Sequence, residues 1–355
     1  MHDPNHPSPT SDRQILVVAG SGRSGTSLFT GLTGRLGFHI PKPEVAANKS
    51  NPRGFGEPRW AVDFHNELLA SVDVVVEDGR PEAWEATSEL AQRPEVVARL
   101  REWLEDQFAE SDRVVVKDPR LAWFLELYRV ACAEIGADLR VATMLRDPAE
   151  VMRSREIAYG TRTGNTTRVI GWINMMLGIE SRTRDLPRAT LNYTDLLDDW
   201  RSAFAAADRT LAAGLIDQAS PDQVAEADAL VDPGLRRSVT SWDELGLGPR
   251  TRDLATRVYD AYGRLVGAEG DAQTAVRAEL DALSEEFAAF YEEAYDVSLN
   301  RTRAGERRER RKGARKVRQE LTATHAAELA ARDAERPDTG LRGRIGALVR
   351  RDRDS

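Results

Sequence analysis

The sequence predicts an α/β fold of three layers, α/β/α, with a central, mainly parallel sheet and a helical C-terminal extension. Three observations predict it. Short β-branched runs alternate with helical segments over roughly the first 200 residues, the first run ends in a glycine-rich turn, and the composition becomes highly charged after about residue 300. Strands that alternate with helices imply right-handed crossovers and parallel strands covered on both faces.

The expected elements follow from hydrophobic periodicity. Strands are predicted at residues 14–19, 72–78, 113–117 and 139–146, with a further strand within 189–197. Helices are predicted at residues 27–37, 59–72, 94–110, 122–136, 251–266 and 274–295, and a loop rich in Pro, Asn and Gly at residues 41–58. Ligands of such sheets bind where the strands end, which directs attention to residues 20–25, 117–120 and 146–148.

The domain organisation follows from composition. Residues 1–13 are polar and are expected to be disordered, residues 14–298 to form the main domain, and residues 299–355 a charged helical or coiled-coil tail. The net charge of -8 is unevenly spread, because residues 301–355 carry 17 Lys/Arg and 9 Asp/Glu. The rest of the chain is acidic, which argues against nucleic acid as a partner of the main domain, since phosphate neutralisation supplies most of that affinity. No nucleic-acid partner is expected.

The ends of the chain bear on its location. Neither a signal peptide nor an apolar run of about 18 residues is present, so a cytoplasmic protein is expected. Near the C-terminus, Leu341, Ile345, Leu348 and Val349 share one helical face among arginines. This pattern suits an interfacial helix, so contact with the inner membrane face or self-association through the tail is expected.

The turn after the first strand, GSGRSGTS (residues 20–27), resembles a phosphate-binding loop. Gly20 and Gly25 have Walker spacing, but Thr26 stands where a Walker lysine would be, and the cation Arg23 lies inside the turn. A glycine-rich turn at a helix N-terminus offers backbone N–H donors to an anion. The expected fold is therefore P-loop-like, with a phosphate that needs no Walker lysine.

A second cation follows the strand at 139–146. In RDPAEVMRS, Asp147, Pro148 and Glu150 are accounted for as a helix start. Arg146 and Ser154 remain as a cation and a hydroxyl that could hold a second phosphate.

Together, these motifs resemble the sulfotransferases that use 3′-phosphoadenosine 5′-phosphosulfate (PAPS). The resemblance rests on GSGRSGTS, KDPR (residues 117–120) and RDPAEVMRS, is extended by NPRGFGEP and LNYTDLL, and covers residues 14–200. It implies metal-free, in-line transfer of a sulfuryl group from PAPS to a hydroxyl or amine. The expected donor-binding residues are Gly22, Arg23, Ser24, Gly25, Thr26 and Ser27 for the 5′-phosphosulfate, Arg146 and Ser154 for the 3′-phosphate, and Tyr193 near the adenine.

The sequence identifies the catalytic residues less clearly than the donor-binding residues. Arg23 is expected to stabilise charge on the bridging oxygen, and Lys117 to reach the sulfuryl group. The histidine that small-molecule sulfotransferases carry after the middle strand is absent, and Asp118 stands next to Lys117 instead. Carbohydrate-type relatives use a glutamate after the loop helix, which makes Glu57 the first candidate for the base, with Asp118 and His65 as alternatives.

Two departures from the family pattern are evident. The aromatic residue that often follows the loop hydroxyls is Leu28, and the late R-K-G element has no clear counterpart. Arg236 and Arg237 are the expected substitutes for its 3′-phosphate contacts. The expected acceptor is a carbohydrate or glycolipid; the alternatives are an ATP-dependent P-loop phosphotransferase and a non-catalytic nucleotide-binding scaffold.

Overall fold

The computed structural model describes residues 11–48, 51, 54–160, 163–232, 234, 240–268 and 270–334. Contacts divide the chain into two compact units, Met1–Tyr291 and Glu292–Ser355. The first unit contains every element up to the start of the last helix. The second contains the remainder of that helix, α12 (Gly270–Ala334).

A four-stranded parallel sheet forms the centre of the first unit. Its strands are β1 (Gln14–Ala19), β2 (Arg113–Lys117), β3 (Asp138–Leu145) and β4 (Arg188–Asn192), in the order β2-β1-β3-β4. Val18 pairs with Lys117 and Ala19 with Thr143, so the ends of β1 and β2 lie side by side, next to the last residues of β3. The predicted α/β class with a parallel central sheet is confirmed.

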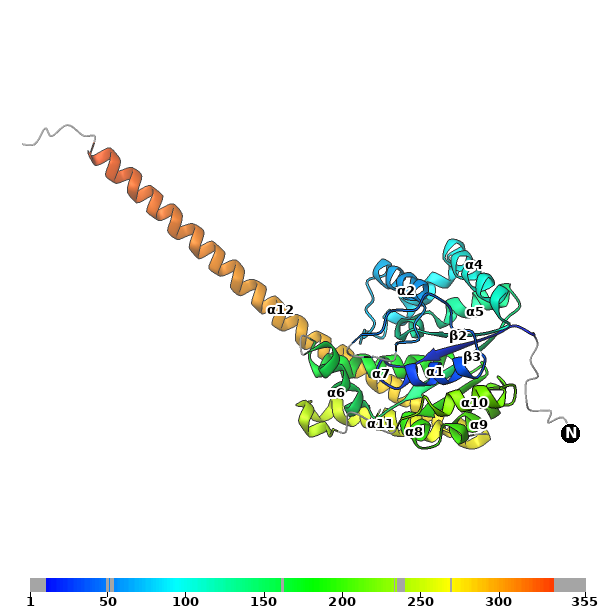
Figure 1. The fold of residues 1–355 in the computed structure, drawn as a ribbon. Helices are drawn as coiled ribbons and strands as arrows, with labels where there is room; N and C mark the ends of the chain where they lie inside the picture. Colours follow the sequence, from blue (N-terminus) through cyan, green and yellow to red (C-terminus); the bar gives the residue numbers. More distant parts are fainter. Residues whose placement is uncertain are drawn as a thin grey trace, which may run out of the picture. The chain divides into compact units, whose positions relative to one another are not determined.

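Helices cover both faces of the sheet (Figure 1). Successive residues of β1 point to opposite faces of the sheet and enter different cores. Ile15 and Val17 pack on one face, and Leu16 and Val18 pack on the other. The first core is closed by α2 (Arg59–Ser71), α3 (Ala83–Ser88), α4 (Pro94–Glu110) and α5 (Leu125–Glu134). The second is closed by α1 (Thr26–Arg35), α8 (Tyr193–Asp198), α9 (Trp200–Leu211) and α10 (Pro221–Asp228).

A third core lies beyond the end of β3. It joins α6 (Pro148–Tyr159), α7 (Asn165–Arg182), α11 (Pro249–Leu265) and the first turns of α12. The apolar stripe predicted for residues 274–295 is buried here through Val276, Leu280, Leu283 and Phe287. Short 3-10 helices at Glu89–Gln92, Pro119–Phe124 and Trp242–Leu245 complete the described elements.

The strand predicted at residues 72–78 is wrong. Asp73 adopts a left-handed backbone conformation (φ 53°), and the Asp78 carboxylate accepts hydrogen bonds from the Val75 and Arg80 amides. These contacts turn the chain at both ends of the run, and Val75 is 62% exposed. The valines therefore form an irregular connection between α2 and α3, because local polar contacts override their β propensity.

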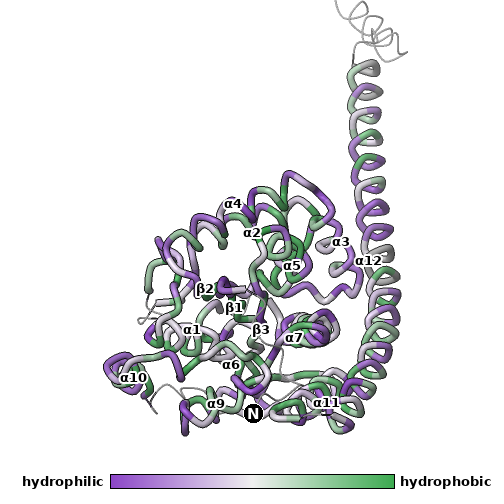
Figure 2. The backbone as a smooth tube through the Cα atoms, turned by 90° about the vertical axis from the view of Figure 1, so that its right-hand side faces the viewer, coloured by the Kyte–Doolittle hydropathy of each residue, from purple (hydrophilic) through white to green (hydrophobic). Residues whose placement is uncertain are grey.

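Hydrophilic residues dominate much of the part of α12 that belongs to the second unit (Figure 2). Among the described residues, no helix combines the length and apolar character that crossing a membrane requires. The residues of the predicted interfacial helix, 341–349, lie outside the described part of the chain.

Candidate active site

The glycine-rich turn between β1 and α1 has the backbone of an anion-binding loop. Gly20, Arg23 and Gly25 all have positive φ angles, of 123°, 76° and 93°. A Cβ on Gly20 would lie 2.9 Å from the Met144 carbonyl oxygen, and one on Gly25 would lie 2.3 Å from Cδ2 of Tyr193. The glycines are thus required by conformation and by close packing, while Arg23 adopts a conformation that costs energy for a non-glycine residue.

Gly25→Ala is expected to lower the free energy of unfolding more than Gly54→Ala. Both residues have positive φ, but a Cβ on Gly54 would meet nothing within 4 Å. Left-handed strain alone costs about 1–2 kcal/mol, and overpacking against Tyr193 adds about 1–3 kcal/mol. Urea unfolding of the two variants measures the difference. Equal destabilisation would show that Tyr193 moves aside freely.

Residues from α6 contact the turn from the side. The helix starts as expected, with Asp147 as the N-cap that accepts a hydrogen bond from the Ala149 amide at 2.8 Å. Two turns later, Ser154 Oγ accepts a hydrogen bond from Arg23 Nε at 3.1 Å. Ser154, predicted to bind one phosphate, therefore lies against Arg23, predicted to bind the other.

Arg146, the residue before the N-cap of this helix, contacts both the turn and Tyr193. Its Nη1 donates to the Arg23 carbonyl oxygen at 3.2 Å, and its Nε donates to Glu150 Oε2 at 2.9 Å. The guanidinium also lies over the Tyr193 ring, 4.5 Å from the centroid. Arg146 and Glu150 are both buried, so the carboxylate holds the guanidinium in place beside the turn.

A buried ion pair lies where β2 ends. Lys117 Nζ donates to Glu57 Oε1 at 2.6 Å, and further contacts join Nζ to Ser27 Oγ at 3.4 Å and to the Phe55 carbonyl oxygen at 3.3 Å. The side chains of Lys117 and Glu57 are only 3% and 11% exposed. The strand end thus brings a cation and a carboxylate to the first turn of α1, although they are 60 residues apart in sequence.

Asp118 and His65, the other candidates for the base, form a separate buried network. His65 Nδ1 lies 2.8 Å from Asp118 Oδ2, and Arg120 Nη1 donates to Asp118 Oδ1 at 2.6 Å. Tyr128 Oη lies 3.3 Å from His65 Nε2. Burial raises the pKa of Asp118, but the hydrogen bond and charge of His65, with the charge of Arg120, outweigh it and leave the pKa lowered.

The lowered pKa makes Asp118 a source of pH-dependent stability. A carboxylate with a depressed folded-state pKa stabilises the protein above its unfolded-state pKa, near 4, and loses this contribution as the pH falls below it. Asp118→Asn is expected to lower the free energy of unfolding by about 1–3 kcal/mol at pH 7, and by less at pH 3.5. Urea unfolding at both pH values checks this, with exposed Asp63→Asn as the control; a pH-independent loss would contradict it.

One cavity of about 760 Å³ unites most of the predicted site residues. Its lining includes Gly22, Arg23, Gly25, Thr26, Ser27, Glu57, Lys117, Arg146, Ser154 and Tyr193. Ser24, Asp118 and His65 are not part of the lining. Arg236 and Arg237 lie outside the described residues. The Ser24 hydroxyl is buried and has no hydrogen-bond partner among the described residues.

Sequence reasoning missed Arg155, which supports the turn from behind. Its Nε donates to the Gly22 carbonyl oxygen at 3.3 Å, and its guanidinium pairs with Glu77. Burial lowers the pKa of Arg155. An arginine on a polar helix is typical of a solvated face, so only its position next to Ser154 could have pointed to this role.

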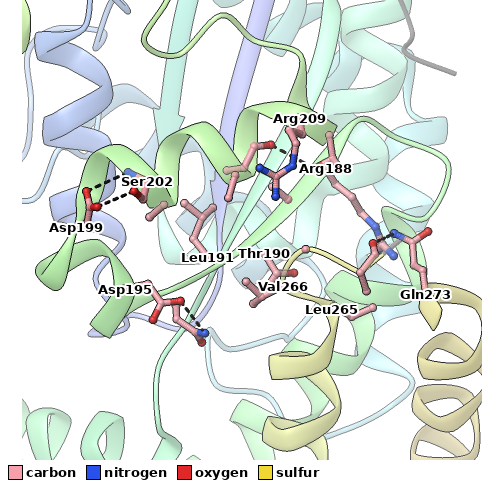
Figure 3. Close-up of a pocket in the computed structure, with 18 of the residues that line it drawn as sticks. Arg188, Thr190, Leu191, Asp195, Asp199, Ser202, Arg209, Leu265, Val266 and Gln273 are labelled. Atoms are coloured by element: carbon pink, nitrogen blue, oxygen red, sulfur yellow. Dashed lines mark hydrogen bonds between the residues drawn. The ribbon is translucent and has the colours of Figure 1, made fainter. Parts of the chain in front are cut away.

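A second cavity, of about 340 Å³, lies along the outer edge of β4 (Figure 3). Leu191, Thr190 and Asp195 line it together with residues of α9 and of the connection from α11 to α12. It contains none of the residues predicted for the site. The described residues also include no group of three or more His, Cys, Asp or Glu side chains arranged to hold a metal ion.

Comparisons with known proteins add little to this geometry. No protein-family model matches the chain, and no curated protein matches it. Among solved structures, it is similar to the sulfotransferase domain from the Synechococcus PCC 7002 olefin synthase, with 19% identity, coverage of 72% of this chain and 96% of that chain, and a TM-score of 0.39. A TM-score this low bears on neither fold nor function.

Proposed function

We propose that the protein is a PAPS-dependent sulfotransferase that acts on a hydroxyl or amine of a carbohydrate or glycolipid acceptor. The observation that carries this proposal is the meeting of Arg23, Arg146 and Ser154 at a phosphate loop that lacks a Walker lysine. Two cations beside one loop suit a nucleotide with phosphates at both the 5′ and 3′ positions. The loop also opens into a cavity large enough for a nucleotide.

The donor fits the residues that surround the turn. The first backbone N–H groups of α1 and the positive end of its dipole favour the 5′-phosphosulfate, with Thr26 and Ser27 as hydroxyl donors. Arg146 and Ser154 provide a guanidinium and a hydroxyl for the 3′-phosphate, and the Tyr193 ring provides an apolar face for the adenine. When bound, PAPS supplies the sulfuryl group that the acceptor attacks.

The remaining residues suit proton transfer and charge stabilisation. Glu57 Oε1 is held by Lys117, while Oε2 has no hydrogen-bond partner among the described residues and is the atom that would take the acceptor proton. Lys117 and Arg23 place positive charge near the loop, where negative charge develops on the leaving nucleotide. Asp118 is held instead by His65 and Arg120, away from the cavity lining.

Binding and transfer measurements test the proposal. Calorimetry should show that adenosine 3′,5′-bisphosphate binds without magnesium and more tightly than ATP. Incubation with ³⁵S-labelled PAPS and fractionated cell extract should then place label in a glycan or lipid fraction. Magnesium-dependent ATP binding in preference to the bisphosphate would support a phosphotransferase, and nucleotide binding with no labelled product would support the scaffold alternative.

A further inference from the structure

The second unit carries a strongly basic stretch of helix, residues 305–318 of α12, which we call the basic segment. All of its side chains are exposed. Its cations are Arg307, Arg308, Arg310, Arg311, Lys312, Arg315, Lys316 and Arg318, against two carboxylates, Glu306 and Glu309. Lys312 pairs with Glu309 at 2.7 Å, and Lys316 lies 3.9 Å from Glu320. The six arginines have no ion pair with any described residue.

The cations surround most of the helix. With 3.6 residues per turn, successive side chains are about 100° apart, so the cations span an arc of about 240°. The remaining arc contains Glu306, Glu309, Gly313 and Val317. A helix that lies on a lipid surface needs an apolar face, and the basic segment has none. A flat anionic surface would also contact only part of this arc, so some of the cations would have no anion next to them.

The same spacing places like charges next to one another. Arg307 and Arg311, Arg311 and Arg315, and Lys312 and Lys316 are four residues apart, a spacing at which like charges destabilise a helix. A polyanion that surrounds the helix would relieve this repulsion. Repulsion between neighbouring cations that no anion of the described chain offsets is typical of a binding surface.

The length and diameter of the basic segment favour duplex DNA as the polyanion. The basic segment is about 20 Å long, which gives one cation per about 2.5 Å, compared with one phosphate per about 1.7 Å of DNA duplex. An α-helix of about 10–12 Å diameter fits the major groove of B-form DNA, about 12 Å wide, whereas the major groove of A-form RNA is too narrow. We propose that the basic segment binds double-stranded DNA through its phosphates, without sequence preference.

This proposal does not depend on the sulfotransferase activity. Residues 1–300 carry a net negative charge, as the charge balance of the sequence shows, so the basic segment and not the main domain should account for the binding. Because each neutralised phosphate adds about -0.9 to the slope of log K against log salt concentration, about six contacts predict a slope near -5.

Fluorescence anisotropy of the full-length chain with a labelled 20-base-pair DNA duplex tests the proposal. We expect micromolar affinity in low salt and a slope near -5. Replacing Arg307, Arg308, Arg310 and Arg311 with Gln, a good helix former, should reduce the magnitude of the slope by about 3–4 and weaken binding at least tenfold. Glu306→Gln with Glu309→Gln should strengthen binding.

A charge-matched control distinguishes an effect of the basic segment from an effect of the net charge of the chain. Replacing Arg59, Arg201, Arg252 and Arg257, exposed arginines of the first unit, with Gln should leave the slope unchanged. Equal weakening in this control would overturn the proposal, as would equal affinity for a 20-base-pair RNA duplex. Absence of DNA binding in low salt would overturn it too. Sedimentation with phosphatidylglycerol vesicles, lost in the four-arginine variant while DNA binding is unaffected, would assign the surface to lipid instead.

Discussion

Glu57→Gln is expected to lower the sulfuryl-transfer rate by about 10²–10⁴-fold while leaving nucleotide affinity within about twofold. A glutamine cannot take the acceptor proton, but its amide oxygen can still accept the hydrogen bond that Lys117 donates to Glu57 Oε1. The buried lysine therefore keeps a partner, and the fold should survive. Single-turnover transfer from ³⁵S-labelled PAPS, with calorimetry of adenosine 3′,5′-bisphosphate, measures the two effects separately.

The control for this experiment lies in the same cavity. Glu44 also lines it, is 24% exposed, and pairs with Lys42. Glu44→Gln should leave the rate nearly unchanged, because this carboxylate is not held against the phosphate loop. A comparable loss in Glu44→Gln, or full activity in Glu57→Gln combined with inactivity in Asp118→Asn, would remove Glu57 from the role of base.

Arg146→Ala is expected to weaken the binding of adenosine 3′,5′-bisphosphate by roughly 100-fold, because a hydrogen bond to a charged group contributes about 1.5–3 kcal/mol and its guanidinium can form two. Binding of adenosine 5′-phosphate should change much less, since that nucleotide has no 3′-phosphate to lose. Isothermal titration of both nucleotides measures the contrast. Equal weakening of the two would mean that Arg146 supports the loop and does not read the 3′-phosphate.

The alanine variant needs a partner variant because Arg146 has structural contacts as well. It donates to the Arg23 carbonyl oxygen and to buried Glu150, so its removal also takes a hydrogen-bonded cation away from a buried carboxylate. Arg146→Ala combined with Glu150→Gln removes the charge of that carboxylate as well. If the double variant regains stability but not affinity for the bisphosphate, the loss is due to phosphate recognition.

Hydrophobic patterning was sufficient for most of the fold. The runs QILVVA, RVVVK and LRVATML are buried strands of one parallel sheet, as predicted. The run at residues 72–78 has the same composition but forms no strand, since Asp73 and Asp78 turn the chain locally. β-branched composition shows that a segment is apolar, but not whether a sheet edge is available to it.

The sequence by itself determined the phosphate loop, the cations that follow the strands and the basic character of the tail, because these depend on residue type and short spacing. Only the tertiary structure decided which carboxylate faces which cation. Glu57 meets Lys117 and Asp118 meets His65 across 60 and 53 residues, so two adjacent residues, Lys117 and Asp118, enter separate networks. Successive residues at a strand end point to opposite sides of the sheet. Long-range packing, which local spacing does not encode, sets the partner on each side.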